Sequence, residues 1–100
     1  MLELRPICEH CATDLPPAST EARICSYECT FCATCVDKVL SNVCPNCGGG
    51  FVPRPVRPSH NHTGPWLGKH PAKVDRHHQP VGEGFPALRD KLKDVPPERR

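Results

Sequence analysis

Eight cysteines, all lying between Cys8 and Cys47, constrain this 100-residue chain more than any other feature. They form four ordered pairs, with spacings C-x2-C, C-x3-C, C-x2-C and C-x2-C. A C-x2-C pair can converge on one ion, and four thiolates complete a tetrahedral zinc site with Zn–S distances of about 2.3 Å. The sequence therefore predicts two structural Zn²⁺ ions, held by eight ligands: Cys8, Cys11, Cys25, Cys29, Cys32, Cys35, Cys44 and Cys47.

Three other uses of cysteine fit the chain less well. A disulfide scaffold needs an oxidising compartment, and the first residues lack the charged and apolar regions of a signal peptide. Thioredoxin-like chemistry needs a C-x2-C motif in a βαβ unit, and no such unit fits the sequence. An iron–sulfur cluster on the run from Cys25 to Cys35 would leave the other four cysteines as a spare set. We therefore expect a reduced, cytoplasmic zinc protein.

Few other side chains can build a core. Aromatic residues make up 5% of the chain, and no apolar run approaches the roughly 18 residues of a membrane helix. Small domains of this composition need metal or disulfides for stability, so we expect the folded part to be unfolded without zinc. The candidate core residues are Leu4, Ile7, Leu15, Ile24, Phe31, Val36, Val39, Leu40, Val43 and Phe51.

The chain changes in composition near residue 52. Residues 1–52 hold every cysteine and have a net charge of −3, whereas residues 53–100 have a net charge of +5 and 9 of the 13 prolines. Alternating prolines and basic residues favour an extended backbone. The sequence thus predicts a compact module over 1–52 and a largely irregular tail without a core over 53–100. Helical spacing of Leu88, Leu92 and Val95 predicts one short helix in this tail, over 85–95.

The module is predicted to have a small zinc-stabilised α+β fold with one short β-hairpin and one short helix. The hairpin is expected over 21–26 and 28–31, with Ile24 and Phe31 pointing inward. The helix is expected over 33–41, because its apolar residues recur at helical spacing, and Asn42 is expected to end it.

The residues alone leave two zinc arrangements open, since either consecutive or alternate cysteine pairs could share an ion. The order of the pairs, ending in the C-P-x-C motif of Cys44–Cys47, resembles that of RING fingers. Cys29 stands where most RING fingers have His, which makes this an all-cysteine variant. The resemblance implies a cross-brace, with one zinc on Cys8, Cys11, Cys32 and Cys35 and the other on Cys25, Cys29, Cys44 and Cys47.

Residues 2–51 also resemble an uncharacterised family of short, cysteine-rich bacterial proteins. The segments that carry this resemblance are LELRP (2–6), DLPP (14–17), EARICS (21–26), ECTFC (28–32) and CPNCGG (44–49). The family has no established activity, so the resemblance supports a zinc-bound fold and implies no reaction.

The RING resemblance raises the question of ubiquitin-ligase activity. Ligase-type RING fingers present a hydrophobe between the first two ligands, an aromatic in the helix and a basic or polar residue after the last ligand. Here Glu9 and His10 fill the first gap, the only Trp is Trp66, and Gly48 follows the last cysteine. We therefore expect no ligase activity and no other enzyme activity. We expect His10 to be a solvent-exposed loop residue rather than a replacement ligand.

We expect the module to bind another protein. Nucleic-acid binding through the basic tail is the alternative, and it is weakened by the acidic module and by the scarcity of tail aromatics, Trp66 and Phe85. A secondary metal-binding tract is a further alternative for the tail histidines, but their irregular spacing favours a polar tail. These histidines are His60, His62, His70, His77 and His78.

Overall fold

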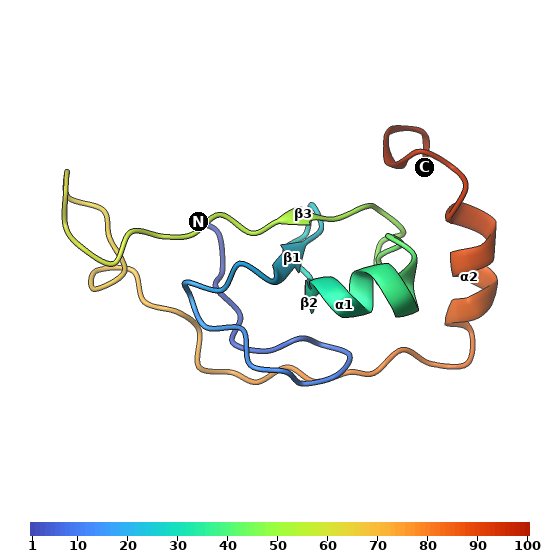
Figure 1. Cartoon of the computed structure of the whole chain (residues 1–100), viewed down its shortest axis with the longest axis horizontal. Helices are drawn as coiled ribbons and strands as arrows, with labels where there is room; N and C mark the ends of the chain where they lie inside the picture. The colour runs from blue at the N-terminus through green and yellow to red at the C-terminus, as the bar shows by residue number, and fades with distance from the viewer.

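The computed structural model describes all 100 residues, and its first half is organised around a small antiparallel sheet (Figure 1). β1 (Ala22–Ile24) and β2 (Thr30–Cys32) form a hairpin, and α1 (Ala33–Cys35) follows β2 directly. The helix continues as one π-helical turn, η1 (Val36–Leu40). β3 (Val52–Pro53) pairs with the other edge of β1, so the strand order is β2-β1-β3.

The predicted hairpin and first helix are both present. Ile24 and Phe31 are buried, as expected, and the Phe31 ring packs edge-on against Phe51 with ring centroids 5.4 Å apart. Ser41 and Asn42 end the helix by adopting left-handed φ angles of 50° and 59°. The Asn42 side chain then accepts a hydrogen bond from the Phe51 backbone N–H at 2.9 Å, which fixes the chain after the loop that carries Cys44 and Cys47.

The sequence analysis did not predict β3, which crosses the expected boundary at residue 52. Pro53 cannot donate a ladder hydrogen bond, and it is tolerated because β3 is an edge strand. The next residue, Arg54, is buried, and its guanidinium donates hydrogen bonds to three backbone carbonyls between residues 5 and 16. The start of the proline-rich segment is therefore anchored in the module. The division of the chain into a module over 1–52 and a tail over 53–100 remains a prediction from the sequence.

Cysteines make up much of the core. Eight of the ten predicted core residues are buried, and Val39 and Phe51 are partly buried against them. The largest buried cluster has 13 residues, and six of them are cysteines. Its other members are Leu15, Ala22, Phe31, Val36, Leu40, Val43 and Phe85. The packing of this core therefore depends on what the cysteine sulfurs bind.

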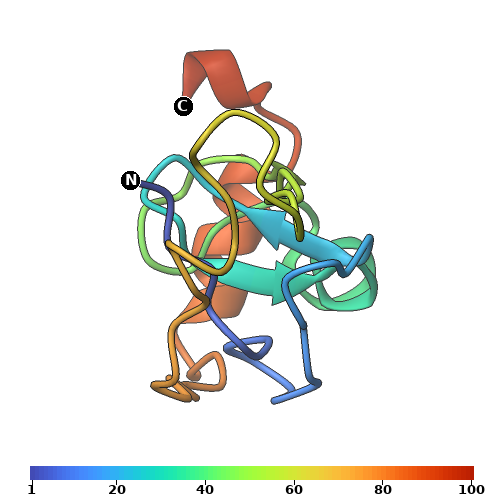
Figure 2. The ribbon, with the colours of Figure 1, turned by 90° about the vertical axis from the view of Figure 1, so that its left-hand side faces the viewer.

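The expectation that residues 53–100 have no core has to be corrected. The segment is largely irregular, but it folds back along the module rather than away from it (Figures 1 and 2). The backbone N–H groups of Lys73 and Gln79 donate to the carbonyls of Leu4 and Glu9 at 3.0 and 2.8 Å. Such pairing satisfies backbone groups that the irregular N-terminal segment leaves without partners.

Two short helical elements follow this returning segment, residues 73–84. α2 (Phe85–Leu92) covers part of the predicted range 85–95, and the 3-10 turn η2 (Pro97–Arg99) comes after it. Phe85 is only 6% exposed and belongs to the main core cluster. An isolated helix of this length is unstable in water, so α2 depends on this packing. No helix of the structure has the length and apolar character needed to cross a membrane.

Candidate metal centre

The first cysteine cluster joins two segments that are far apart in the sequence. Cys8 and Cys11 come from the loop before the hairpin, and Cys32 and Cys35 come from the end of β2 and from α1. All four sulfur atoms lie within 4.8 Å of one another. The Sγ atoms of Cys11 and Cys32 are 3.8 Å apart, and a tetrahedral site with Zn–S bonds of ~2.3 Å has edges of about 3.8 Å. The cluster thus has the size of a four-thiolate zinc site.

The second cluster joins the turn of the hairpin to the loop after the first helix. The sulfur atoms of Cys25, Cys44 and Cys47 lie within 4.8 Å of one another. Cys29 is buried beside them but is not within this distance of all three. The side-chain amide of Asn46 donates to the Cys29 sulfur at 3.4 Å, which places this thiol next to the Cys44–Cys47 loop.

Several N–H groups are directed at the cysteine sulfurs. The backbone N–H groups of Tyr27, Cys35 and Gly49 donate to the sulfurs of Cys25, Cys32 and Cys47, each at 3.4 Å. Gly48 precedes the last of these donors and has a φ of 78°, which glycine adopts without strain. Donors aimed at sulfur stabilise a thiolate, and such outer partners orient metal ligands. The local backbone therefore suits charged sulfurs.

Burial and crowding shift the pKa values of several thiols in the two clusters. Burial raises the pKa of the Cys35 and Cys44 thiols, and neighbouring cysteines raise it further. Burial also raises the pKa of Cys11, but hydrogen bonds with Thr13, Cys8 and Cys35 together outweigh it and lower this pKa to about 6. Without a cation, the crowded buried sulfurs favour the protonated form. A bound divalent metal reverses this preference, because it stabilises thiolates directly.

The four cysteine pairs are therefore not grouped in sequence order. The structure brings the first pair together with the third, and it brings Cys25 of the second pair together with the fourth. The run from Cys25 to Cys35, considered above for an iron–sulfur cluster, is divided between the two clusters.

His10 differs from its expected role as a solvent-exposed loop residue. It is partly buried, its Nδ1 accepts a hydrogen bond from the Val81 backbone N–H at 3.1 Å, and its carbonyl lies 3.0 Å from His78 Nε2. His10 is partly buried because the returning segment covers the Cys8–Cys11 loop.

Glu9 is a buried residue of this loop whose role the sequence analysis missed. Its carboxylate accepts hydrogen bonds from the Thr30 backbone N–H at 2.6 Å and from the Arg5 guanidinium at 3.1 Å. Its backbone bonds to Thr30 and Gln79, so one residue connects the N-terminal segment, the hairpin and the returning segment. Nothing in the sequence around Glu9 indicates that its side chain is buried, because a Glu between two cysteines is equally compatible with an exposed loop.

We expect Glu9→Ala to destabilise the zinc-loaded protein by about 2–3 kcal/mol, because it leaves the buried Thr30 N–H without an acceptor. Glu3→Ala is the matched control, since Glu3 also pairs with Arg5, at 3.2 Å, but its side chain is 43% exposed, against 3% for Glu9. An exposed ion pair contributes at most about 1 kcal/mol. Urea unfolding of both variants measures the difference, and equal losses would contradict the role assigned to Glu9.

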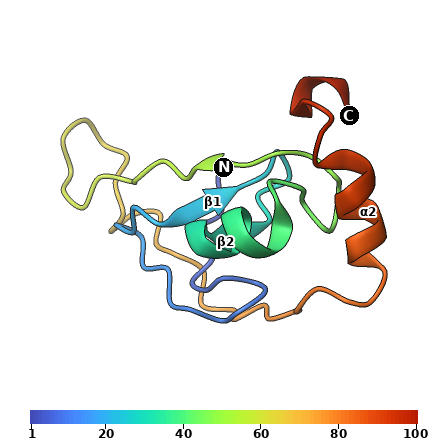
Figure 3. The same ribbon diagram turned by 45° about the vertical axis from the view of Figure 1, so that its right-hand side comes forward.

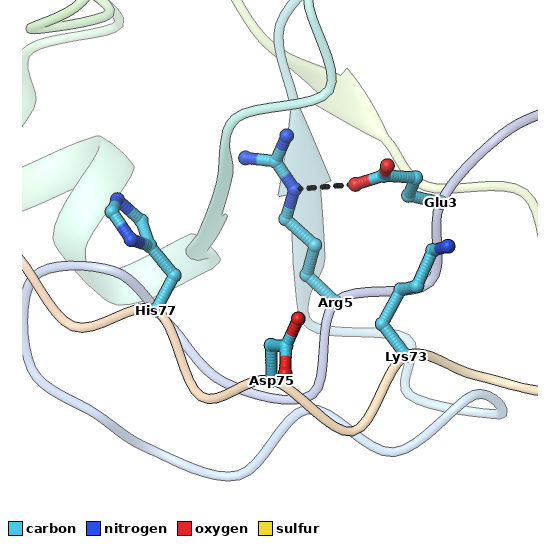
Figure 4. A pocket seen from close by; sticks show the side chains of 5 residues that line it. All are labelled: Glu3, Arg5, Lys73, Asp75 and His77. Carbon is cyan, nitrogen blue, oxygen red and sulfur yellow. Dashed lines mark hydrogen bonds and ion pairs between the residues drawn. The ribbon is translucent and has the colours of Figure 1, made fainter.

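A polar recess lies between the N-terminal segment and the returning segment (Figure 4). It has a volume of about 370 Å³ and no hydrophobic lining residue. Its side chains carry both signs of charge, and His77 Nε2 lies 3.8 Å from the Glu9 carboxylate. The recess contains no cysteine and is separate from the two clusters. It is lined by Glu3, Arg5, Lys73, Asp75 and His77.

Comparison with known proteins identifies a family but no function. A family model described as "Protein of unknown function (DUF1272)" matches residues 1–57, which include all eight cysteines. An uncharacterized protein of Rhizobium meliloti (strain 1021) is 52% identical over 82 residues, covering 82% of this chain and 92% of that protein. No solved structure matches the chain. The resemblance to an uncharacterised cysteine-rich family is therefore confirmed.

Proposed function

This chain belongs to the DUF1272 family of proteins of unknown function, and we propose that it is a non-enzymatic protein built on two structural zinc ions. The gathering of four sulfurs within 4.8 Å, from segments more than 20 residues apart, is the observation that carries the proposal. An all-thiolate, tetrahedral donor set suits zinc among the divalent metals. Zinc in such closed sites stabilises the fold and leaves no open position for a substrate.

The proposed arrangement is a RING-like cross-brace. The first ion is held by the first and third cysteine pairs, which form the first cluster. The second ion is held by Cys25, Cys44 and Cys47, and metal binding draws the adjacent Cys29 into the fourth position. All eight sulfurs then serve as ligands, so no thiol is left as a nucleophile. A protein that keeps eight thiolates reduced fits the cytoplasm better than an oxidising compartment.

The module's task in this proposal is to bind another protein. Three guanidinium groups of the basic segment are engaged within the chain, which weakens the nucleic-acid alternative. Arg54 and Arg57 donate to backbone carbonyls, and Arg76 pairs with Asp14 at 2.9 Å. These guanidinium groups are directed at the chain itself rather than arranged as a free basic face.

Metal analysis tests the proposal. We expect protein purified under reducing conditions to be colourless and to contain two zinc ions per chain by inductively coupled plasma mass spectrometry. One zinc per chain, or iron accompanied by visible absorption, would contradict the two-zinc proposal.

A further inference from the structure

Arg54 is the one basic residue of the chain that is buried, and it has no acidic partner. It is 4% exposed, and none of the ion pairs of the protein includes it. Its Nε is also the one buried side-chain polar atom without a hydrogen-bond partner. Burial lowers the pKa of this guanidinium, and no acidic group opposes the shift. A buried charge is costly unless it is compensated, so the surroundings of Arg54 have to offset this cost.

The Arg54 guanidinium closes the base of the loop that carries the first cysteine pair. We define this loop as residues 5–16, and its two arms pair through one isolated β-bridge. Nη1 donates to the Arg5 carbonyl of the first arm at 2.9 Å. Nη2 donates to the Leu15 and Pro16 carbonyls of the second arm at 3.2 and 3.1 Å. The carbonyls of Arg5 and Leu15 accept no other hydrogen bond within the chain, so the guanidinium sets the spacing of the two arms.

The backbone of Arg54 connects this loop to the strands that lead to the other ligands of the first cluster. Its N–H donates to the Ala22 carbonyl at 2.9 Å, and Ala22 lies opposite Cys32 in the pairing of β1 with β2. The segment that follows β3 runs beside the start of the chain (Figure 3). Leu15, whose carbonyl Arg54 binds, lines a recess of about 400 Å³ together with three of the four cysteines. Arg54 is thus connected to the first cluster both through Leu15 and through β1.

We propose that Arg54 is a positioning residue for the first metal site. Its guanidinium fixes the base of the loop that presents the first cysteine pair to the third, and its charge compensates the negative charge of the four thiolates. This inference rests on the proposed function, because Arg54 has this role only when a metal occupies the site. Groups that support a metal site from behind its ligands orient those ligands and tune the affinity for the metal.

The charge of the metal site accounts for a buried guanidinium without an acidic partner. Four thiolates and one divalent ion leave a net negative charge on the site. The other buried charged side chain, Glu9, is already paired with Arg5 at 3.1 Å. Compensation is reciprocal: Arg54 raises the affinity of the site for metal, and bound metal lowers the cost of burying Arg54. Since no other basic residue is buried, the second site lacks such a counterpart.

Zinc competition on the full chain tests this assignment. Zinc-loaded wild type, Arg54→Met and Arg54→Lys are titrated with the chromophoric chelator pyridylazoresorcinol in oxygen-free buffer. The thiols freed at each step are alkylated with N-ethylmaleimide and mapped by mass spectrometry. We expect Arg54→Met to weaken zinc binding at the first site roughly ten- to hundredfold and to leave the second site unchanged. Arg54→Lys should recover part of this affinity, because it keeps the charge and loses the planar fork.

Arg57→Met is the matched control for the loss of a guanidinium from this segment. Arg57 also donates to two backbone carbonyls, those of Leu2 and His70, at 2.7 and 2.6 Å. Neither carbonyl belongs to the loop of residues 5–16, so both zinc affinities of this variant should equal those of wild type.

Three results would overturn the proposal: unchanged zinc affinity in Arg54→Met, equal weakening at both sites, or an Arg54→Lys variant no better than Arg54→Met. If Arg54→Met fails to fold with zinc present, Arg54→Lys carries the same comparison and should release zinc from the first site more readily than wild type does. Wild type without two zinc ions overturns the proposed function itself. Wild type with two ions and no site-specific loss in the variants overturns the role of Arg54 alone.

Discussion

Removal of metal with a chelator in reducing buffer is expected to unfold the whole cysteine module. Six of the 13 residues in the main core cluster are cysteines, and the aliphatic residues around them are few. Structural zinc contributes an apparent ~10–16 kcal/mol per ion in zinc-finger peptides, which equals or exceeds the total stability of about 5–15 kcal/mol of a typical domain. Losing both ions, as the chelator does, therefore outweighs the remaining packing.

Amide dispersion in a ¹H–¹⁵N spectrum measures this effect. We expect the signals of β1, β2 and the first helix to collapse with chelator and to return when zinc is added back. α2 should undock in the same step, because Phe85 packs in the cluster that the cysteines build. Zinc-saturated chelator is the control, since it cannot remove metal. A dispersed spectrum that persists after the metal has been removed would show that the core keeps the module folded without zinc, and would contradict this prediction.

The second large effect is expected from pairs of cysteine substitutions. Cys8→Ala and Cys35→Ala each remove one ligand of the first cluster, so each should lower the zinc content from two to one per chain. Combining them should still leave one zinc, because both ligands belong to the same ion. Cys8→Ala combined with Cys44→Ala should leave none, because these cysteines lie in different clusters.

These combinations separate the two arrangements that the sequence leaves open. If consecutive cysteine pairs shared an ion, Cys8 and Cys35 would belong to different sites and their double variant would hold no zinc. Native mass spectrometry after dialysis against a weak competing chelator counts the ions. Ser26→Ala is the control, because Ser26 is exposed and lies next to a ligand without being one. Its zinc content should remain at two.

Local patterns in the sequence predicted the local parts of this structure. The spacing of the cysteines indicated which residues gather sulfur, and the apolar positions Ile24 and Phe31 identified the hairpin. The periodicity of Val36 and Leu40 identified the first helix and its buried side. In each case the signal comes from residues close together in the chain. The pairing of distant cysteines was left open on the residues alone, because spacing does not say which loops meet.

The unpredicted features all depend on contacts between distant segments. The proline-rich composition predicted an extended segment outside the module from residue 53, yet Pro53 pairs with the free edge of β1. The periodicity of α2 indicated a helix but not the surface on which it docks. Burial of Glu9 follows from the N–H of Thr30 and the guanidinium of Arg5. Composition described residues 53–100 as polar and extended, and neither property prevents a chain from pairing its backbone with a neighbouring segment.

The most direct test of the central claim is ¹¹³Cd NMR of the cadmium-substituted protein, in which couplings connect each metal to the β-protons of its own cysteine ligands. The account predicts two cadmium signals, one coupled to the first and third cysteine pairs and the other to the second and fourth, including Cys29. A single signal, or couplings that join Cys8 and Cys11 to Cys25 and Cys29, would contradict it.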